Sequence, residues 1–172
     1  MVYTWTNETP VGRLFLGGDG ESLQFLLFDS DRNLQRPPLS ELGQDDSDWH
    51  ESPDSFGETI RQLDAYFAGE LRTFDLPLLP PGTEFQQEVW SALSTIPYGA
   101  TVTYGKIAAQ IGRPRASRAV GLANGSNPIS IVIPCHRVIG SNGKLTGYGG
   151  GLERKQTLLQ LEAPRPQQLS FL

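Results

Sequence analysis

The sequence predicts an α+β fold: a small N-terminal domain of β-sheet and helix over residues 1–82, followed by a mainly helical domain over residues 83–172 with a helix-turn-helix. Runs rich in β-branched and aromatic residues, separated by turn signals, fill the N-terminal third, whereas apolar residues at helical spacing prevail after residue 83. Between them, residues 76–82 (LPLLPPG) indicate a linker, because their prolines interrupt any helix.

The N-terminal domain is expected to open with a β-meander. Its strands are expected at residues 2–6, 12–16 and 23–28, with turn signals at 10–12 and 17–20. Residues 29–54 are polar and contain two adjacent prolines, which predicts a loop. A helix follows, with Gly69 expected to end it. The apolar residues at helical spacing in this helix are Phe56, Ile60, Leu63 and Phe67.

The second domain begins with a clear helix start. Thr83 and Gln86 have the spacing of a capping box, and residues 97–99 (PYG) are expected to close the helix. Its apolar face consists of Phe85, Val89, Leu93 and Ile96.

Two short helices around a tight turn come next. Thr103 is expected to cap the first helix, residues 112–114 (GRP) form the turn, and the second helix covers about residues 115–124. The inward residues of the first helix are Ile107, Ala108 and Ile111. This arrangement resembles a helix-turn-helix, and an ordinary helical hairpin is the alternative.

The helix over residues 115–124 has mostly small side chains, with Arg118 among them. The small residues are Ala116, Ser117, Ala119, Gly121 and Ala123. Such a face can approach another surface closely, and the long cation can reach into it. Tight packing against neighbouring helices, with Arg118 in solvent, is the simpler alternative.

Further along the chain, residues 129–133 are predicted to form a buried strand and residues 141–143 a turn. Residues 147–151 (GYGGG) are expected to form a backbone-exposing loop before a last helix that ends near Glu162. The final segment, APRPQQLSFL, is expected to be loosely ordered.

Composition restricts the classes of protein that fit. One cysteine in 172 residues cannot form an internal disulfide, which is typical of a reducing, cytoplasmic setting. With only three Cys and His residues in all, a structural zinc site is not expected. No apolar run is long enough for a transmembrane helix, and the N-terminus has no signal-peptide pattern.

Charge is distributed unevenly along the chain. Residues 1–82 contain five basic and 15 acidic side chains, whereas residues 83–172 contain nine basic and four acidic ones. A basic C-terminal half suits a polyanionic partner, and uneven surface solvation is the alternative.

Residues 131–140 (IVIPCHRVIG) place the only cysteine, Cys135, beside His136. A free thiol has a pKa of about 8.5, so a nearby base or positive charge is needed to increase the thiolate fraction. Pro134 cannot donate to a sheet ladder, so the chain can turn there and bring thiol and imidazole to one side. Glu162 is a candidate carboxylate for fixing the tautomer of His136. A buried cysteine acting only as a small apolar side chain is the alternative.

The segment 134–138 (PCHRV) is similar to the active-site signature of the O6-alkylguanine-DNA alkyltransferases. Four further segments match that family at its spacing: 103–104 (TY), 118–121 (RAVG), 127–128 (NP) and 148–152 (YGGGL). The resemblance is specific across residues 83–162 and looser over the N-terminal part. It implies DNA repair by irreversible, single-turnover transfer of an alkyl group from O6-alkylguanine to the protein itself, and leaves O4-alkylthymine open as a second substrate.

The resemblance also implies catalytic roles. Cys135 would accept the alkyl group, and His136 would act as the base through a bound water, oriented by Glu162. Tyr104 would hydrogen-bond guanine N3. Asn127 would be the hinge that ties the recognition helix to the Cys135 segment.

Substrate contacts are implied in the same way. The backbone carbonyls of Cys135 and Val138 would read the exocyclic amine of guanine. The amide of Gly149 would face O6, at a position where many relatives have Ser, and Tyr148 would form a wall of the alkyl pocket.

The resemblance places the second helix of the helix-turn-helix in the DNA minor groove. Arg118 would fill the gap left by the flipped base, and the small residues Ser117, Ala119 and Gly121 would lie against the groove. The expected partner is double-stranded DNA containing alkylated guanine, bound through the minor groove, with no membrane partner. We expect a monomer without a cofactor or metal.

Three other classes of protein fit less well. Alkyltransferase-like proteins bind damage but usually have Trp in place of the acceptor cysteine. A cysteine hydrolase needs an oxyanion hole, for which the sequence has no separate motif. A helix-turn-helix transcription regulator leaves the PCHRV segment and the glycine-rich loop without a purpose.

Overall fold

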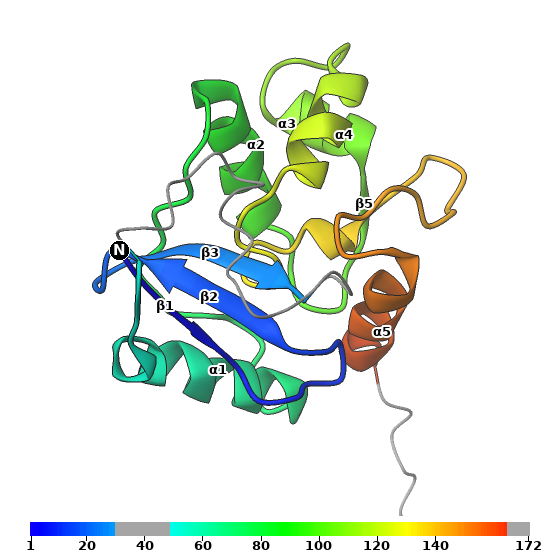
Figure 1. The fold of residues 1–172 in the computed structure, drawn as a ribbon. Helices are drawn as coiled ribbons and strands as arrows, with labels where there is room; N and C mark the ends of the chain where they lie inside the picture. The colour runs from blue at the N-terminus through cyan, green and yellow to red at the C-terminus, as the bar shows by residue number, and fades with distance from the viewer. Residues whose placement is uncertain (30–48, 165–172) are drawn as a thin grey trace, which may run out of the picture.

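The computed structural model describes residues 1–29 and 49–164, and these residues have the α+β fold that the sequence predicts. In Figure 1 the sheet lies in the middle of the molecule, with α1 (Gly57–Phe67) at the bottom of the view and three helices of the C-terminal part at the top. These three are α2 (Glu84–Ser94), α3 (Tyr104–Gln110) and α4 (Ser117–Gly125). The last helix, α5 (Leu152–Glu162), lies to one side of the sheet.

The N-terminal part is built on a four-stranded sheet in the order β3-β2-β1-β4. Its strands are β1 (Val2–Trp5), β2 (Leu14–Gly18), β3 (Leu23–Phe28) and β4 (His50–Glu51). The first three pair antiparallel, which confirms the predicted meander, and β4 pairs parallel with β1.

The predicted loop over residues 29–54 is wrong at its C-terminal end. Residues 50–51 form β4, and Pro53–Phe56 form a short 3-10 helix, η3. A two-residue strand with exposed side chains has no alternation of apolar and polar residues by which to recognise it. Residues 30–48 of that prediction lie outside the described residues.

The two faces of the sheet bury different side chains. Leu14, Leu16 and Leu26 belong to the main core, which continues through α1 into the C-terminal helices. Phe15, Phe25 and Trp49 form a separate aromatic cluster. The main core is therefore shared by the N-terminal and C-terminal parts of the chain.

The proline-rich segment over residues 76–82 contains no helix, but it is held against the sheet. Leu23 donates its backbone N–H to Pro77 at 2.8 Å, and Leu79 donates to Leu23 at 2.9 Å. A second segment bonds to the same strand, because Leu26 donates to the carbonyl of Pro128 at 2.8 Å. Strand β3 thus contacts both the connecting segment and the segment that leads to Cys135.

The N-terminal ends of α2 and α3 have the caps that the sequence predicts. Thr83 and Gln86 form the reciprocal bonds of a capping box at the start of α2, and the Thr83 side chain accepts from the backbone of Gln86. Thr103 caps α3 by accepting from the N–H of Lys106. The Trp90 indole donates to Ala123 at 2.8 Å and so joins α2 to α4.

The predicted strand over residues 129–133 is wrong. These residues form compact turns in which Ile133 donates its N–H to Ile129 at 3.0 Å and Ile131 adopts a φ of +70°. Positive φ in a β-branched residue is strained and costs on the order of 1–3 kcal/mol. A short apolar run indicates that the segment is buried, but it does not distinguish a strand from a buried turn. The strand prediction was wrong for this reason.

Candidate active site

Cys135 lies at the start of a short 3-10 helix, η4 (Cys135–Arg137), directly after the strained turn. The next residues form β6 (Val138–Ile139), which pairs parallel with β5 (Val102–Thr103). This pairing brings the N-terminus of α3 beside the Cys135 segment. Two parts of the family resemblance, around Tyr104 and around Cys135, are thereby adjacent.

The Cys135 thiol is free and buried, with the residue only 3% exposed. The Asn127 side chain donates from Nδ2 to Sγ at 3.0 Å and to the carbonyl of Ile133 at 2.8 Å, and its Oδ1 accepts from the N–H of Ile129. Burial raises the pKa of Cys135, while the hydrogen bond from Asn127 and the positive charge of Lys155 oppose that rise. Asn127 therefore both fixes the turn and favours the thiolate.

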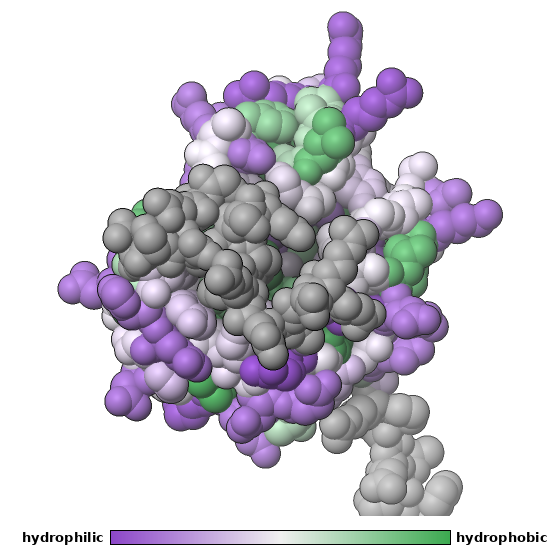
Figure 2. Space-filling model, viewed as in Figure 1, coloured by the Kyte–Doolittle hydropathy of each residue, from purple (hydrophilic) through white to green (hydrophobic). Residues whose placement is uncertain are grey.

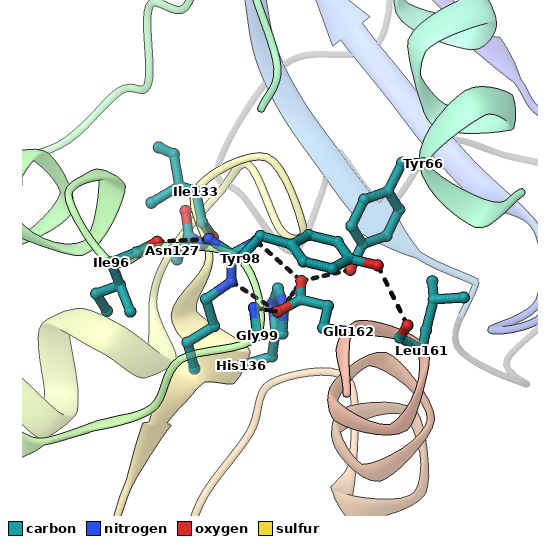
Figure 3. Close-up of polar contacts among 10 residues, drawn as sticks. Tyr66, Ile96, Tyr98, Gly99, Asn127, Ile133, His136, Leu161 and Glu162 are labelled. Atoms are coloured by element: carbon teal, nitrogen blue, oxygen red, sulfur yellow. Dashed lines mark hydrogen bonds and ion pairs between the residues drawn. The ribbon is translucent and has the colours of Figure 1, made fainter. Parts of the chain in front are cut away.

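The side chains of His136 and Glu162 are in contact in the interior of the molecule. His136 Nε2 lies 2.8 Å from Glu162 Oε1, and both side chains are almost fully buried (Figure 3). His136 Nδ1 is buried as well and contacts no protein hydrogen-bond partner in the described part of the chain. Burial lowers the pKa of His136, and the hydrogen bond to Glu162 opposes that shift.

Glu162 has three further partners that the sequence did not indicate. Arg137 donates from Nε to Oε2 at 2.8 Å and from Nη2 to Oε1 at 2.9 Å, Tyr66 donates its hydroxyl at 2.7 Å, and Gly99 donates its N–H at 3.3 Å. Figure 3 shows Tyr66, His136 and Gly99 gathered around this carboxylate. Burial alone would raise the pKa of Glu162, but the hydrogen bonds from His136 and Arg137 outweigh it and lower the pKa to about 2.

Gly99 allows this close approach. Its φ is +76°, and a Cβ at this position would lie 2.8 Å from the backbone oxygen of Glu162. The predicted helix-closing segment over residues 97–99 is thus also a contact surface for the end of α5. Tyr98 contributes by donating its hydroxyl to the carbonyl of Leu161 at 3.2 Å.

Lys155 is a second buried cation near the thiol that sequence reasoning missed. Its Nζ donates to the carbonyls of Val138 at 2.6 Å and Thr146 at 2.9 Å, and burial lowers its pKa. Lys155 therefore ties the loop that precedes α5 to the segment that follows Cys135. An unpaired Lys on a helix otherwise resembles a solvated side chain, so nothing in the sequence marked it.

Tyr148 lies beside the thiol. Burial raises the pKa of Tyr148, the charge of Cys135 raises it further, and the tyrosine in turn lowers the pKa of Cys135. Gly149 follows in an exposed turn. Tyr104 is half-buried at the start of α3 and donates its hydroxyl to the carbonyl of Thr146 at 3.3 Å.

Helix α4 carries the residues expected to face DNA. Arg118 and Ala119 are exposed, and Leu122 is 78% exposed. A groove of about 610 Å³ is lined by several of the predicted residues together with Leu122. The predicted residues that line it are Tyr104, Ser117, Arg118 and Gly121. In Figure 2, hydrophilic side chains surround a small hydrophobic patch at the end of the molecule where α3 and α4 lie.

No group of His, Cys, Asp and Glu side chains in residues 1–29 and 49–164 is arranged to hold a metal ion. None of the helices within these ranges has the length and hydropathy that crossing a membrane requires.

Fold and site together define a helix-turn-helix protein with one buried thiol, which is linked to the end of the second helix by Asn127 and flanked by a buried His-Glu pair. Residues 84–164 match the family model described as 6-O-methylguanine DNA methyltransferase, DNA binding domain. Residues 1–80 match the ribonuclease-like domain of the same family. The chain belongs to the 6-O-methylguanine DNA methyltransferase family, which confirms the resemblance found in the sequence.

Individual relatives are similar over nearly the whole chain. A methylated-DNA–protein-cysteine methyltransferase of Methanosarcina acetivorans is 55% identical over 155 residues, covering 90% of this chain and 94% of the relative. A protein of the same name from Mycobacterium tuberculosis is 52% identical over 165 residues, covering 96% and 94%. The crystal structure of Mycobacterium tuberculosis OGT in complex with DNA has a TM-score of 0.82 at 51% identity, covering 95% of this chain and 96% of that chain.

Proposed function

We propose that this chain repairs DNA by transferring the alkyl group of O6-alkylguanine to Cys135, irreversibly and once per molecule. The observation that carries the proposal is the position of the only cysteine in the chain. Its buried thiol accepts a hydrogen bond from Asn127 and precedes a histidine that a buried carboxylate holds. Relatives that carry the name methylated-DNA–protein-cysteine methyltransferase are more than half identical to this chain.

The chemistry follows from these contacts. His136 takes the thiol proton through a water, and Glu162 holds the imidazole in place for this step. The thiolate attacks the alkyl carbon, a carbon–sulfur bond forms, the bond from carbon to O6 breaks, and its electron pair stays on the purine, which takes up a proton. The thioether product is a poor leaving group, so Cys135 is consumed.

Several residues are proposed to bind the flipped guanine. The carbonyls of Cys135 and Val138 read its exocyclic amine, and the carbonyl of Val138 keeps one lone pair for this purpose while Lys155 occupies the other. The Gly149 amide faces O6. Tyr104 hydrogen-bonds N3 and must give up its bond to Thr146 to do so.

The groove on α4 is proposed to receive the DNA minor groove. Ser117, Ala119 and Gly121 let the backbone approach the duplex, and Arg118 takes the place of the extruded base. Flipping costs a few kcal/mol, which a wedged side chain partly offsets.

The proposal extends to the domain organisation and the location of the chain. Two units, residues 1–82 and 83–172, are supported by the change from sheet to helix and by two family models that match residues 1–80 and 84–164. The single free thiol supports a reducing, cytoplasmic location. A monomer is proposed because one chain contains the thiol in contact with Asn127 and His136 in contact with Glu162.

One mass measurement tests the proposal. The protein is incubated with duplex oligonucleotide containing O6-methylguanine, and the intact mass and the Cys135 peptide are measured. We expect one added methylene on Cys135 per protein molecule, and none in Cys135→Ser, which should still bind the duplex. Binding without modification in the natural chain would favour a damage-binding protein, and more than one turnover per molecule would favour a hydrolase; either result overturns the proposal.

A further inference from the structure

The N-terminal sheet contacts the wall of the thiol site. Phe28 is the last residue of β3, where it pairs with Leu14 of β2. Its ring meets the ring of Tyr148 edge to face, with centroids 5.7 Å apart and an interplanar angle of 61°. Tyr148 in turn packs against the core cluster that contains Cys135, and Lys155 Nζ, which donates to the carbonyl of Val138, lies 6.0 Å from the Tyr148 ring centroid. A side chain from the N-terminal part therefore lies directly behind the residue proposed to form the alkyl pocket.

Arg154 of α5 also contacts the Phe28 ring that packs against Tyr148. Its guanidinium lies 5.3 Å from the Phe28 ring centroid. It also donates to three backbone carbonyls, those of Val11 at 2.8 Å, Asp29 at 2.8 Å and Gly150 at 3.2 Å. Two of these carbonyls flank strands of the N-terminal sheet and the third lies in the glycine-rich loop. One side chain thus fixes the loop to the sheet.

At Gly150 the glycine-rich loop packs closely against the Phe28 ring. A Cβ at Gly150 would lie 2.5 Å from two ring atoms of Phe28 and 2.9 Å from a ring atom of Tyr148. Only glycine leaves room for both rings at these positions. The sheet and the loop are therefore closely packed at Gly150, which follows Gly149 directly and lies two residues after Tyr148.

We propose that Phe28 and Arg154 are positioning residues that hold Tyr148 against the thiol site and thereby set the size of alkyl group that the site accepts. They act through Tyr148 and do not touch the reacting atoms. This inference rests on the alkyl transfer proposed above. It gives the N-terminal part a specific task at the site, beyond its share of the common core.

The test compares two matched substitutions in the same strand, Phe28→Leu and Phe25→Leu. Phe25 packs in the separate aromatic cluster with Phe15 and Trp49, so its replacement reports only the loss of a buried ring in β3. Single-turnover rates are measured for O6-methylguanine and O6-benzylguanine in the same duplex oligonucleotide. The readout is the ratio of the benzyl rate to the methyl rate, which general loss of folded protein does not change.

We expect Phe28→Leu to raise the benzyl-to-methyl ratio by about 2- to 10-fold, the range that loss of one aromatic pair allows. Phe25→Leu should leave the ratio unchanged. Arg154→Lys keeps the charge but cannot bind three carbonyls in a fixed fork, so it should change the ratio in the same direction as Phe28→Leu. An unchanged ratio in both Phe28→Leu and Arg154→Lys would overturn the inference.

A second comparison uses the close approach at Gly150. Gly150→Ala should slow methyl transfer, because the new methyl group displaces the rings beside it. In the Phe28→Ala, Gly150→Ala double variant the ring is gone, so the alanine should slow transfer less than it does in the natural background. Equal slowing in both backgrounds would contradict the proposed contact. Absence of any transfer by the natural chain would instead refute the proposed function.

Discussion

Replacing Glu162 by glutamine removes the one carboxylate that faces the Arg137 guanidinium in the described part of the site. Arg137 is almost fully buried, and its remaining hydrogen bond is to the carbonyl of Ile96 at 2.6 Å. Glutamine is nearly the same shape, so the change leaves a buried cation without its counter-charge. Breaking a buried ion pair in this way costs about 3–5 kcal/mol of unfolding free energy.

That loss is large for a single domain, whose total stability is about 5–15 kcal/mol. Urea slopes for small proteins are about 1–3 kcal/mol per molar, so the unfolding midpoint of Glu162→Gln should fall by about 2 M. Fluorescence or circular dichroism against urea concentration, at neutral pH, measures this shift. The slope itself should not change, because both proteins expose the same surface on unfolding.

The pH dependence gives a second signature. Glu162 has a folded-state pKa of about 2, below its reference value of 4.5, so its stabilising contribution is present above about pH 4.5 and is lost as the pH falls toward 2. Glu162→Gln should lack this part of the acid sensitivity.

The exposed pair between Glu58 and Arg61 supplies the matched control, and Glu58→Gln should leave the urea midpoint unchanged. A shift for Glu162→Gln no larger than the control's would refute the reasoning, because it would mean that Arg137 is not held by Glu162.

Other substitutions test the thiol and the DNA surface. Asn127→Ala and Lys155→Met should each raise the thiol pKa further, and the rate of Cys135 alkylation by iodoacetamide should then shift to higher pH; curves that superimpose on the natural protein's would exclude both contributions. Arg118→Ala should slow transfer from duplex DNA far more than from free O6-alkylguanine, which needs no flipping, and each lost phosphate contact should reduce the salt slope of log K by about 0.9. Arg118→Lys should restore part of the duplex rate, and equal slowing on both substrates would assign Arg118 to the fold instead.

Local patterns predicted the local structure well. The three strands of the meander, the Thr83 capping box and the helix that ends at Glu162 were all recognisable, because each depends on residues close together in the sequence. The turn over residues 129–133 was not, since its form is set by buried backbone bonds to Asn127 and to strand β3. Burial was predicted there, and conformation was not.

In the candidate site, too, residues marked by sequence motifs were predicted, whereas contacts between distant elements were not. Cys135, His136 and Glu162 were predicted from a family motif and a single late carboxylate, and the structure places His136 and Glu162 in contact. The partners of Glu162 were missed because they come from distant elements: Tyr66 lies 96 residues away along the chain. No local pattern encodes a contact of that separation, which depends on how α1 packs against α5.

The N-terminal part therefore contacts the site at two separate points, although no sequence pattern predicted a role for it there. Tyr66 of α1 donates to Glu162, on the side of the proposed base His136, and Phe28 of β3 packs against Tyr148, on the side of the proposed alkyl pocket. A variant that weakens the first contact should alter the pH dependence of thiol reactivity, whereas one that weakens the second should alter the preference between alkyl groups. Because these readouts are independent, Tyr66→Phe should leave the benzyl-to-methyl ratio unchanged while Phe28→Leu changes it. If both variants changed the ratio equally, the N-terminal part would be acting through overall stability and not through these two contacts.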